Sequence, residues 1–319
     1  MRSRGFFAYP FFVFLAVFTL LAVFVLRGGP VSAEDPVLNV EQSAAQSAVS
    51  LRAEGAEVRF MAANIWGDYF GNPVGPQREG AFVDVFRRYA PDVIALQEVT
   101  PSWWRSRLFT DLGPEWGFVR GTDEEKARNY IPILYRKDRL TLLDEGFSLF
   151  HVELDRSKGM TWAVFEVKAT GRRFIAFSTH FWWRSTPESN PIRVRNAEMV
   201  LAQIRKLQET WKCPAIGGGD FNCRVGSDPM NHFAENGWVS AQEIAGSVSQ
   251  EASHHGDPVR SEDGKYRGFP RRKGNVKANS IDHILVEQGK CRVATLRVVL
   301  DQDALDASDH SPIYADVAF

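Results

Sequence analysis

A succession of eight short apolar or β-branched runs, separated by turn clusters, most constrains what this chain can fold into. Runs of about four to eight such residues, bounded by turn-forming residues, are typical of β-strands. We therefore expect a sheet-rich domain. The predicted strands are residues 58–62, 93–97, 131–135, 162–167, 174–178, 215–218, 281–286 and 313–317.

Two further segments carry an apolar stripe at helical spacing, and each helix would cover one face of a sheet. With about eight strands and few helices, two packed sheets are more economical than one doubly wound parallel sheet. The expected fold class is α+β, a four-layer α/β/β/α sandwich of two mixed sheets flanked by helices. The stripes consist of Phe82, Val85, Phe86 and Tyr89 in one segment and of Val194, Ala197, Leu201, Ile204 and Leu207 in the other.

The N-terminus has the organisation of an export signal. Arg2 and Arg4 precede an uncharged, mostly apolar run over residues 5–26, and the small residues Val31 and Ala33 fit cleavage after Ala33. An uncleaved anchor is the alternative, because an apolar run longer than about 18 residues can span a bilayer. In both cases the positive N-terminus stays inside. Residues 1–33 therefore predict a protein that is secreted or anchored to the outer face of the membrane.

The rest of the chain divides into a tether and one domain. Residues 34–56 are rich in Ala, Ser, Glu and Gln and lack a sustained apolar face, so we interpret them as a flexible tether. Residues 57–319 are long enough to bury one large core, and we expect them to form a single catalytic domain. The three cysteines are too few for a disulfide framework, although one bridge is compatible with export. Packing in the core is the simpler interpretation.

Polar side chains able to bind metal or phosphate lie at the ends of several predicted strands. Each has a simpler explanation when taken alone: Glu98 could cap the following helix, and Asp220 and Asn222 could satisfy a Gly-rich turn. Such residues stand at five predicted strand ends, and five coincidences are far less probable than one. Strand ends at one rim of a sheet can converge on one cleft. The residues at these ends are Glu98, His180, Asp220, Asn222, Asp282, Asp309 and His310.

Six short motifs in a fixed order resemble those of the endonuclease/exonuclease/phosphatase superfamily, which has the DNase I-like fold. The combination of Gly-Asp-Phe-Asn with Ser-Asp-His is specific, and the motifs extend over most of the chain. The resemblance implies a divalent-metal-dependent phosphoesterase. The motifs are Asn64-Ile65, Leu96-Gln97-Glu98-Val99, Thr179-His180, Gly219-Asp220-Phe221-Asn222, Ile281-Asp282-His283-Ile284 and Ser308-Asp309-His310-Ser311-Pro312.

The resemblance implies a metal site made of Glu98, assisted by Asn64 and completed by Asp309. Carboxylate and amide oxygens suit Mg²⁺, and Mn²⁺ or Ca²⁺ would also fit such ligands. In the nuclease members an acidic residue can stand two positions after the motif asparagine, but this chain has Trp66 there. A single metal is therefore the expectation.

The resemblance also implies the catalytic roles. Asp220 would act as base or orienter for the attacking water, and Asn222 would donate its amide to phosphate. His310 would face the scissile phosphate while Asp282 holds its other ring nitrogen and stabilises the imidazolium. His180 would donate to a phosphate oxygen or to the leaving group.

Candidate substrate-binding residues lie beside these motifs. Trp66 and Trp182 offer aromatic faces for bases, sugars or lipid surfaces, and Arg193 is a weaker landmark of the family. A loop over residues 265–277 has six basic residues and no acidic one. Within it, Arg271 and Arg272 are candidates for phosphate contact, although a solvated surface loop is the simpler interpretation.

The net charge of the chain bears on whether its substrate is a nucleic acid or a small compound. The 38 basic and 39 acidic residues nearly cancel, so the whole molecule has no electrostatic drive toward nucleic acid. We expect a small phosphorylated substrate such as a sugar phosphate, an inositol phosphate or a phospholipid head group. A secreted nuclease is the alternative, favoured by the basic loop, and a binding module that lost catalysis is a remote one. Nothing in the sequence indicates a protein partner, and we expect a monomer.

Overall fold

Each predicted strand run overlaps a strand of the computed structural model, which describes residues 51–69, 73–121, 129–151, 153–249, 251–254 and 280–319. The runs 131–135 and 281–286 begin before their strands do, at residues 133 and 282. Seven strands form the first sheet, in the order β10-β12-β13-β1-β2-β4-β3. Their bounds are β1 Val58–Asn64, β2 Val93–Gln97, β3 Trp116–Val119, β4 Ile133–Arg136, β10 Ser247–Val248, β12 Arg292–Val298 and β13 Ile313–Ala318.

The second sheet has six strands in the order β5-β6-β7-β8-β11-β9. Both sheets are mixed, because β1 and β2 run parallel in one and β7 and β8 run parallel in the other, while their other neighbours are mostly antiparallel. The bounds are β5 Leu140–His151, β6 Asp155–Val167, β7 Arg173–His180, β8 Ala215–Asp220, β9 Trp238–Ser240 and β11 Asp282–Glu287.

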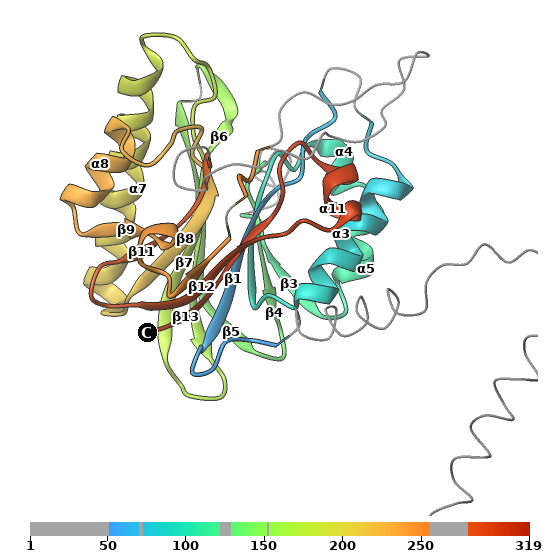
Figure 1. Ribbon diagram of the computed structural model, residues 1–319, viewed down its shortest axis with the longest axis horizontal. Coiled ribbons are helices and arrows are strands. Elements are labelled where there is room, and N and C mark those ends of the chain that lie inside the picture. The colour runs from blue at the N-terminus through green and yellow to red at the C-terminus, as the bar shows by residue number, and fades with distance from the viewer. Residues whose placement is uncertain (1–50, 70–72, 122–128, 152, 250, 255–279) are drawn as a thin grey trace, which may run out of the picture. The chain divides into compact units, whose positions relative to one another are not determined.

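Helices cover the outer face of each sheet, as Figure 1 shows. The stripe of α3 (Pro76–Tyr89) packs with Met61 and Leu96 of the first sheet, and that of α7 (Ser189–Trp211) packs with Phe177 and Leu285 of the second. A central core fills the space between the sheets. The α/β/β/α sandwich predicted from the sequence is therefore confirmed. The other helices are α4 (Pro101–Trp104), α5 (Arg107–Leu112), α8 (Asp228–Glu235), α9 (Ala241–Ile244) and α11 (Gln302–Ala307).

The pairing registers bring the polar strand ends to one rim of the sandwich. In the first sheet Asn64 is level with Gln97, one residue before Glu98. In the second sheet Asp220 is level with His180 on one side and with Asp282 on the other. Parallel neighbours end at the same edge of a sheet, and an antiparallel neighbour begins there. The rim therefore collects residues that are far apart in the sequence.

The glycine run before Asp220 permits this close approach. Gly219 has a φ of 153°, a conformation that residues with a side chain rarely adopt, and a Cβ there would lie 1.9 Å from the carbonyl oxygen of Thr179. A side chain at this position would push β8 away from β7.

Residues 51–56, the end of the predicted tether, contact the domain. The amide of Ala53 donates to Asp316 Oδ2 over 2.8 Å, and the guanidinium of Arg52 donates to the carbonyl of Glu57. Earlier residues of the tether and the apolar N-terminal run lie outside the described residues. Within the described ranges, no helix is long and apolar enough to cross a membrane. All three cysteines are free.

Candidate active site

One part of the rim, which we call the carboxylate half, consists of Asn64, Glu98 and Asp309. Glu98 Oε2 accepts from the amide of Gly67 over 2.8 Å, and Oε1 accepts from Asn64 Nδ2 over 3.1 Å. The carboxylate is thus held by residues on the β1 side of the rim. The N-cap of the following helix α4 is Thr100 and not Glu98.

Backbone conformation also sets Glu98 apart. It has a φ of 62°, and the other rim residues with positive φ are Trp66 at 52° and Asn222 at 51°. Left-handed conformations of residues other than glycine cost free energy and tend to cluster at functional sites. Three such residues at one rim indicate that the surrounding fold holds these side chains in place despite local backbone strain.

Asp309 follows α11 on a loop tied to β1. Ser308 Oγ donates to the carbonyl of Asn64 over 2.8 Å and accepts from the amide of His310 over 3.1 Å. Burial, opposed by His310 and reinforced by the charges of Glu98 and Asp220, raises the pKa of Asp309 to about 7. Such uncompensated negative charge is what a bound cation would relieve, and hard oxygen ligands suit Mg²⁺.

The structure gives Asn64 a particular orientation. Its Oδ1 accepts from the amide of Trp66 over 3.0 Å, and its Nδ2 donates to both Glu98 and Asp220 over 3.1 Å. In this orientation Asn64 positions two carboxylates. That Asn64 binds a metal stays a prediction.

The other part of the rim, the histidine half, consists of His180, Asp220, Asp282 and His310. Nδ1 of His310 lies 2.8 Å from Asp282 Oδ2, and the same oxygen accepts from Ser253 Oγ over 2.6 Å. Although burial lowers the pKa of His310, the charges of Asp282 and Asp309 raise it well above its ordinary value. This is the arrangement of a carboxylate that orients a histidine and stabilises its imidazolium.

Asp220 lies between the two histidines. Its Oδ2 is 3.4 Å from His180 Nε2 and 3.8 Å from His310 Nε2. Burial raises the pKa of Asp220, but the hydrogen bond to His180 and the charge of His310 outweigh it and lower the pKa well below its ordinary range. A carboxylate of so low a pKa stays ionised and is a weak base. This favours orientation of a water over removal of its proton.

Asn222 completes the turn after β8. Its backbone amide donates to Asp220 Oδ1 over 2.8 Å, and its Nδ2 donates to the carbonyl of Phe181 over 3.2 Å. It lies within this cluster, and its contact with phosphate stays a prediction.

Lys158, which the sequence did not indicate, lies inside the histidine half. Its Nζ is 2.8 Å from His180 Nε2 and 3.1 Å from Nδ1, and the residue is 6% exposed. Burial lowers its pKa, against the attraction of Glu98 and Asp155. The predicted strand began at residue 162, whereas β6 begins at Asp155. A lysine inside a buried strand was the available signal, and it lay outside the predicted element.

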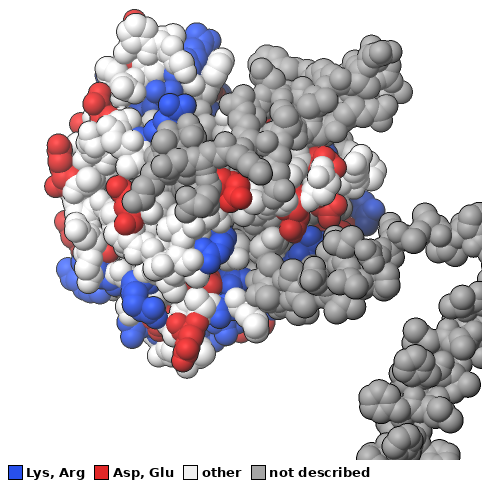
Figure 2. Space-filling model, in the orientation of Figure 1, with Lys and Arg blue, Asp and Glu red and all other residues white. Residues whose placement is uncertain are grey.

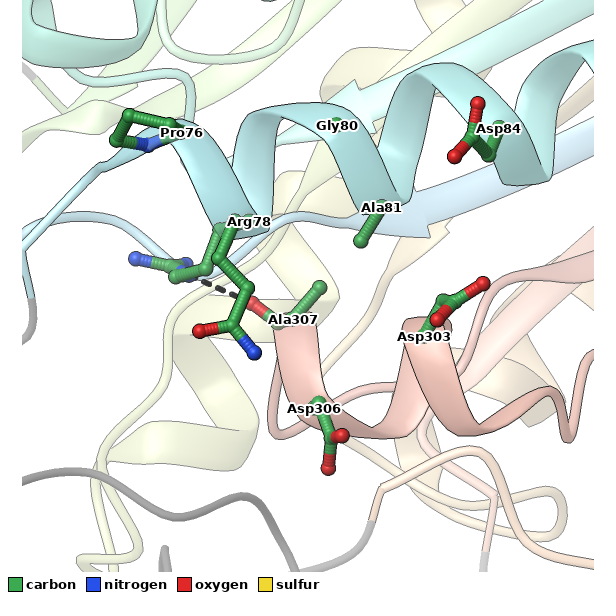
Figure 3. Close-up of a pocket in the computed structure, with 9 residues that line it drawn as sticks. Pro76, Arg78, Gly80, Ala81, Asp84, Asp303, Asp306 and Ala307 are labelled. Atoms are coloured by element: carbon green, nitrogen blue, oxygen red, sulfur yellow. Dashed lines mark hydrogen bonds between the residues drawn. The ribbon is translucent and has the colours of Figure 1, made fainter. Parts of the chain in front are cut away.

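Arg78 on α3 is a second residue that the sequence did not indicate. Its Nε donates to the carbonyl of Ala307 over 2.7 Å, and its Nη2 donates to the carbonyls of both Ile65 and Trp66. Arg78 therefore joins the loop after β1 to the loop that carries Asp309. Figure 3 shows this link beside a cavity of about 300 Å³ between α3 and α11, whose lining residues lie outside the predicted site.

Three of the predicted substrate-binding residues, Trp66, Trp182 and Arg193, are buried. The ring of Trp66 lies against the guanidinium of Arg78 at 5.1 Å and is 8% exposed, and Trp182 is 9% exposed. Arg193 donates to the carbonyls of Trp182 and Arg184 over 2.7 Å, so it anchors the loop after β7. Substrate binding by these three residues stays a prediction.

The exposed aromatic beside His180 is Trp183, which is 51% exposed, with the guanidinium of Arg184 5.3 Å from its ring. Arg271 and Arg272, the basic candidates of the loop, lie outside the described residues. On the face of the described residues in Figure 2, basic and acidic side chains alternate, with wide uncharged areas between them.

The layered fold and this rim define a phosphoesterase domain of the DNase I-like type. The chain belongs to the endonuclease/exonuclease/phosphatase family, whose model matches residues 61–310. The resemblance drawn from the six motifs is therefore confirmed. Members of the family are typically divalent-metal dependent, and the rim offers acidic and histidine groups that could bind an ion.

Solved structures share the fold. A family member from Bacteroides vulgatus is 25% identical, with a TM-score of 0.65 over 82% of this chain and 98% of its own. A mannosyl-6-phosphatase from Bacteroides thetaiotaomicron is 19% identical, with a TM-score of 0.64 over 82% and 100%. The human Nocturnin catalytic domain with a bound sulfate anion is 18% identical, with a TM-score of 0.61 over 82% and 94%. No curated protein sequence matches the chain.

Proposed function

We propose that this protein hydrolyses a phosphate ester of a small phosphorylated compound, such as a sugar phosphate, an inositol phosphate or a phospholipid head group. One observation carries the proposal: Asn64 Nδ2 donates to both Glu98 Oε1 and Asp220 Oδ2 over 3.1 Å. This amide joins the carboxylate half to the histidine half. A metal-binding group and a water-orienting group thus lie within the reach of one phosphate.

The carboxylate half would hold the metal. Glu98 and Asp309 supply hard oxygens, and the raised pKa of Asp309 reports negative charge that a cation would neutralise. We propose Mg²⁺, with Mn²⁺ or Ca²⁺ as substitutes. When bound, the ion would neutralise charge on the phosphate oxygens.

The histidine half would hold the water and the phosphate. Asp220 orients the attacking water, and His310, kept as an imidazolium by Asp282, donates to a phosphate oxygen. His180 and Lys158 lie on the other side of Asp220, where they would donate to a second oxygen or to the leaving group. Asn222 would add an amide donor.

Charge and surface support a small substrate. The net charge is −1, and the described face in Figure 2 carries no continuous basic area of the kind that binds a phosphate backbone. The exposed Trp183, three residues after His180 in the sequence, would offer an apolar face to a sugar ring or a lipid surface. One structural neighbour is a mannosyl-6-phosphatase, which supports a sugar phosphate as one of the substrates to test.

A nuclease is the second candidate, supported by the six basic residues of the loop over residues 265–277. Truncation of this loop should then raise KM for polyanionic substrates more than for small ones. Equal effects on both classes would leave the loop without a role in substrate choice.

A panel assay tests the main proposal. Plasmid DNA, RNA, sphingomyelin, sugar phosphates and inositol phosphates would each be incubated with the enzyme and Mg²⁺, with and without EDTA. We expect EDTA-sensitive release of phosphate or head group from a small substrate. Cleavage of nucleic acid alone would favour the second candidate. Turnover of none of these esters with Mg²⁺ or Mn²⁺ would refute both.

We also propose that the enzyme acts outside the cytoplasm, as a secreted monomer or one anchored by its N-terminus. The support is the sequence of residues 1–33, with two arginines before the apolar run and small residues before the expected cleavage point. N-terminal sequencing of the mature protein after cell fractionation tests this. A chain that starts at Glu34 indicates secretion, an intact N-terminus in the membrane fraction indicates an anchor, and an intact chain in the cytosol contradicts export.

A further inference from the structure

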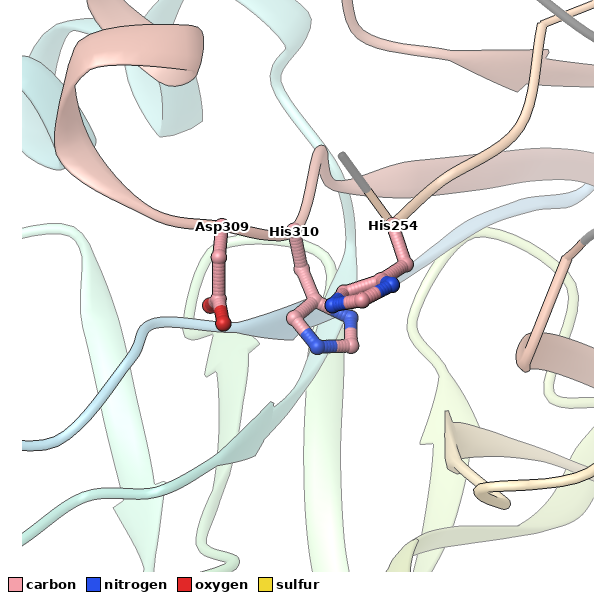
Figure 4. Close-up of side chains that lie close together, drawn as sticks. All are labelled: His254, Asp309 and His310. Atoms are coloured by element: carbon pink, nitrogen blue, oxygen red, sulfur yellow. The ribbon is translucent and has the colours of Figure 1, made fainter. Parts of the chain in front are cut away.

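A third histidine, His254, lies against His310 beside the carboxylate of Asp309. The ring centroids of the two histidines are 4.7 Å apart, with 51° between the ring planes. One ligand atom from each of the three residues lies within 4.8 Å of the other two. Figure 4 shows the two imidazole rings side by side, with the Asp309 side chain next to His310.

The backbone holds these three residues together. His254 and His310 form an antiparallel bridge, and the amide of Ser311 donates to the carbonyl of Ser253 over 2.7 Å. The side chain of Ser253 is fixed as well, because it donates to the carboxylate of Asp282. The backbone positions of His254 and His310 are therefore set by the fold.

Two imidazole nitrogens and one carboxylate oxygen are the donors that Zn²⁺ prefers, whereas Mg²⁺ is held by oxygen. Asp282 occupies the Nδ1 side of His310, which leaves Nε2 as the ligand atom. A carboxylate behind a ligating histidine is the usual second partner of a zinc ligand. Ligand atoms about 2.0–2.2 Å from a tetrahedral ion lie roughly 3.3–3.6 Å apart. The three ligand atoms lie within 4.8 Å of one another, so side-chain rotation would have to bring them closer to reach that spacing.

We propose that His254, Asp309 and His310 form a transition-metal site through which Zn²⁺ reversibly inhibits the enzyme. The site differs from the proposed Mg²⁺ site by its two imidazoles and shares Asp309 with it. Zn²⁺ on His310 Nε2 takes the ring nitrogen that faces Asp220 and removes the donor that the phosphate needs. Zn²⁺ and Mg²⁺ compete for the carboxylate of Asp309.

Zinc binding to the full chain tests the site without any substrate. Equilibrium dialysis against ZnCl₂ and competition with a chromophoric zinc indicator give stoichiometry and affinity. His254→Phe keeps an aromatic ring against His310 but removes the ligand atom. His232→Phe is the matched control, since His232 is also partly exposed and lies on α8.

We expect the wild-type chain and His232→Phe to bind one Zn²⁺ with equal affinity. His254→Phe should bind it at least about 100-fold more weakly, because loss of a direct ligand costs more than the 10–100-fold typical of an outer partner. The Co²⁺ form of the wild-type chain should show the visible absorption of a nitrogen-ligated ion, and that of His254→Phe should not. Equal Zn²⁺ affinity in His254→Phe and wild type overturns the proposal, as does the absence of Zn²⁺ binding to wild type.

Inhibition is measured separately, on whichever ester the panel assay identifies. Zn²⁺ added at a fixed Mg²⁺ concentration should inhibit the wild-type enzyme, and more Mg²⁺ should relieve the inhibition. His254→Phe should keep its own turnover at Zn²⁺ concentrations that inhibit the wild type. The same inhibition curve for both proteins overturns the regulatory role, whatever the substrate.

Discussion

The carboxylate half and the histidine half of the rim differ in how their charges are balanced. In the histidine half the carboxylates lie against basic side chains: Asp282 Oδ2 is 2.8 Å from His310 Nδ1, and Asp220 Oδ2 is 3.4 Å from His180 Nε2. In the carboxylate half, burial and the charges of Glu98 and Asp220 outweigh the charge of His310 and raise the pKa of Asp309 to about 7. Burying a charge is costly unless it is paired. The carboxylate half is therefore the part of the rim where a bound cation would relieve the most unfavourable charge.

Lys158 and His180 connect the two halves electrostatically. Burial raises the pKa of Glu98, but attraction to His180 and Lys158, with hydrogen bonds from Gly67 and Asn64, outweighs it and lowers the pKa. The two carboxyls of this half thus differ, because the pKa of Glu98 is lowered and that of Asp309 is raised. The asymmetry predicts that substitutions in the two halves will have different kinetic signatures.

Asp220→Asn should give the largest effect. Loss of the charge that orients water and faces both histidines should lower kcat by roughly 10²–10⁴-fold, with little change in the Mg²⁺ concentration required for half-maximal activity. Steady-state kinetics over a Mg²⁺ titration measure both quantities. Asp228→Asn, an exposed carboxylate on α8, is the control and should behave as wild type. Near-normal turnover in Asp220→Asn would contradict its role.

Glu98→Gln should instead change the metal dependence. The neutral amide is a weaker ligand, so the Mg²⁺ concentration for half-maximal activity should rise by about 10–100-fold, with part of kcat recovered at saturation. Mg²⁺ titration of activity and calorimetric binding measure the shift. An unchanged Mg²⁺ requirement with a lower kcat would place Glu98 in the histidine half's chemistry.

Asp282→Asn tests the histidine half through pH. The charge of Asp282 raises the pKa of His310, so its removal should lower that pKa. If the imidazolium is the active form, the alkaline limb of the kcat/KM profile should move to lower pH by about one unit or more. A limb at the wild-type pH would show that His310 does not act as an imidazolium.

The same variant predicts a pH-dependent loss of stability. A pKa raised on folding contributes stability that is fully present below the unfolded value of about 6.5 and is lost as pH rises through the folded value. The difference in unfolding free energy between wild type and Asp282→Asn should therefore be larger at low pH than at high pH. Denaturant unfolding at several pH values measures it, and a constant difference would contradict the linkage.

Ser308→Ala should give the smallest effect. It removes the hydrogen bond to the carbonyl of Asn64 and the one from the amide of His310, which together join the halves. The unfolding free energy should fall by about 1–3 kcal/mol, and kcat should fall only severalfold. Urea unfolding and kinetics measure these changes. A loss as large as that of Asp220→Asn would mean that Ser308 contacts the reacting groups.

Much of the fold could be predicted because strands and helices leave local patterns. The runs before Glu98 and Asp220 are apolar, bounded by turns and buried on both faces, and each became a strand. The strands that were not predicted have weaker patterns. β5 is an edge strand with mostly half-buried residues, and β10 has two residues. A strand with few fully buried residues, or with only two residues, leaves little periodicity to read.

The site residues were named from motifs, but their arrangement depended on pairing register. Nothing in the sequence places Lys158 beside His180, because β6 and β7 pair through a register that brings Gly159 opposite His180. The sequence did not indicate a role for Arg78 for a similar reason. Its partners are backbone carbonyls of two distant loops, and carbonyls leave no sequence signal.

By itself, the sequence determined which residue types end the strands and in what order, because strand and turn propensities act over a few neighbours. It thereby determined the layers of the sandwich and the chemical inventory of carboxylates, amides and histidines. Only the tertiary structure decided how that inventory divides into a half where carboxylates lie against histidines and a half where burial and like charges raise the pKa of Asp309. It also placed His254 against His310. Such pairings depend on contacts between segments far apart in the chain, where geometry and burial set the electrostatics and no local pattern reports them.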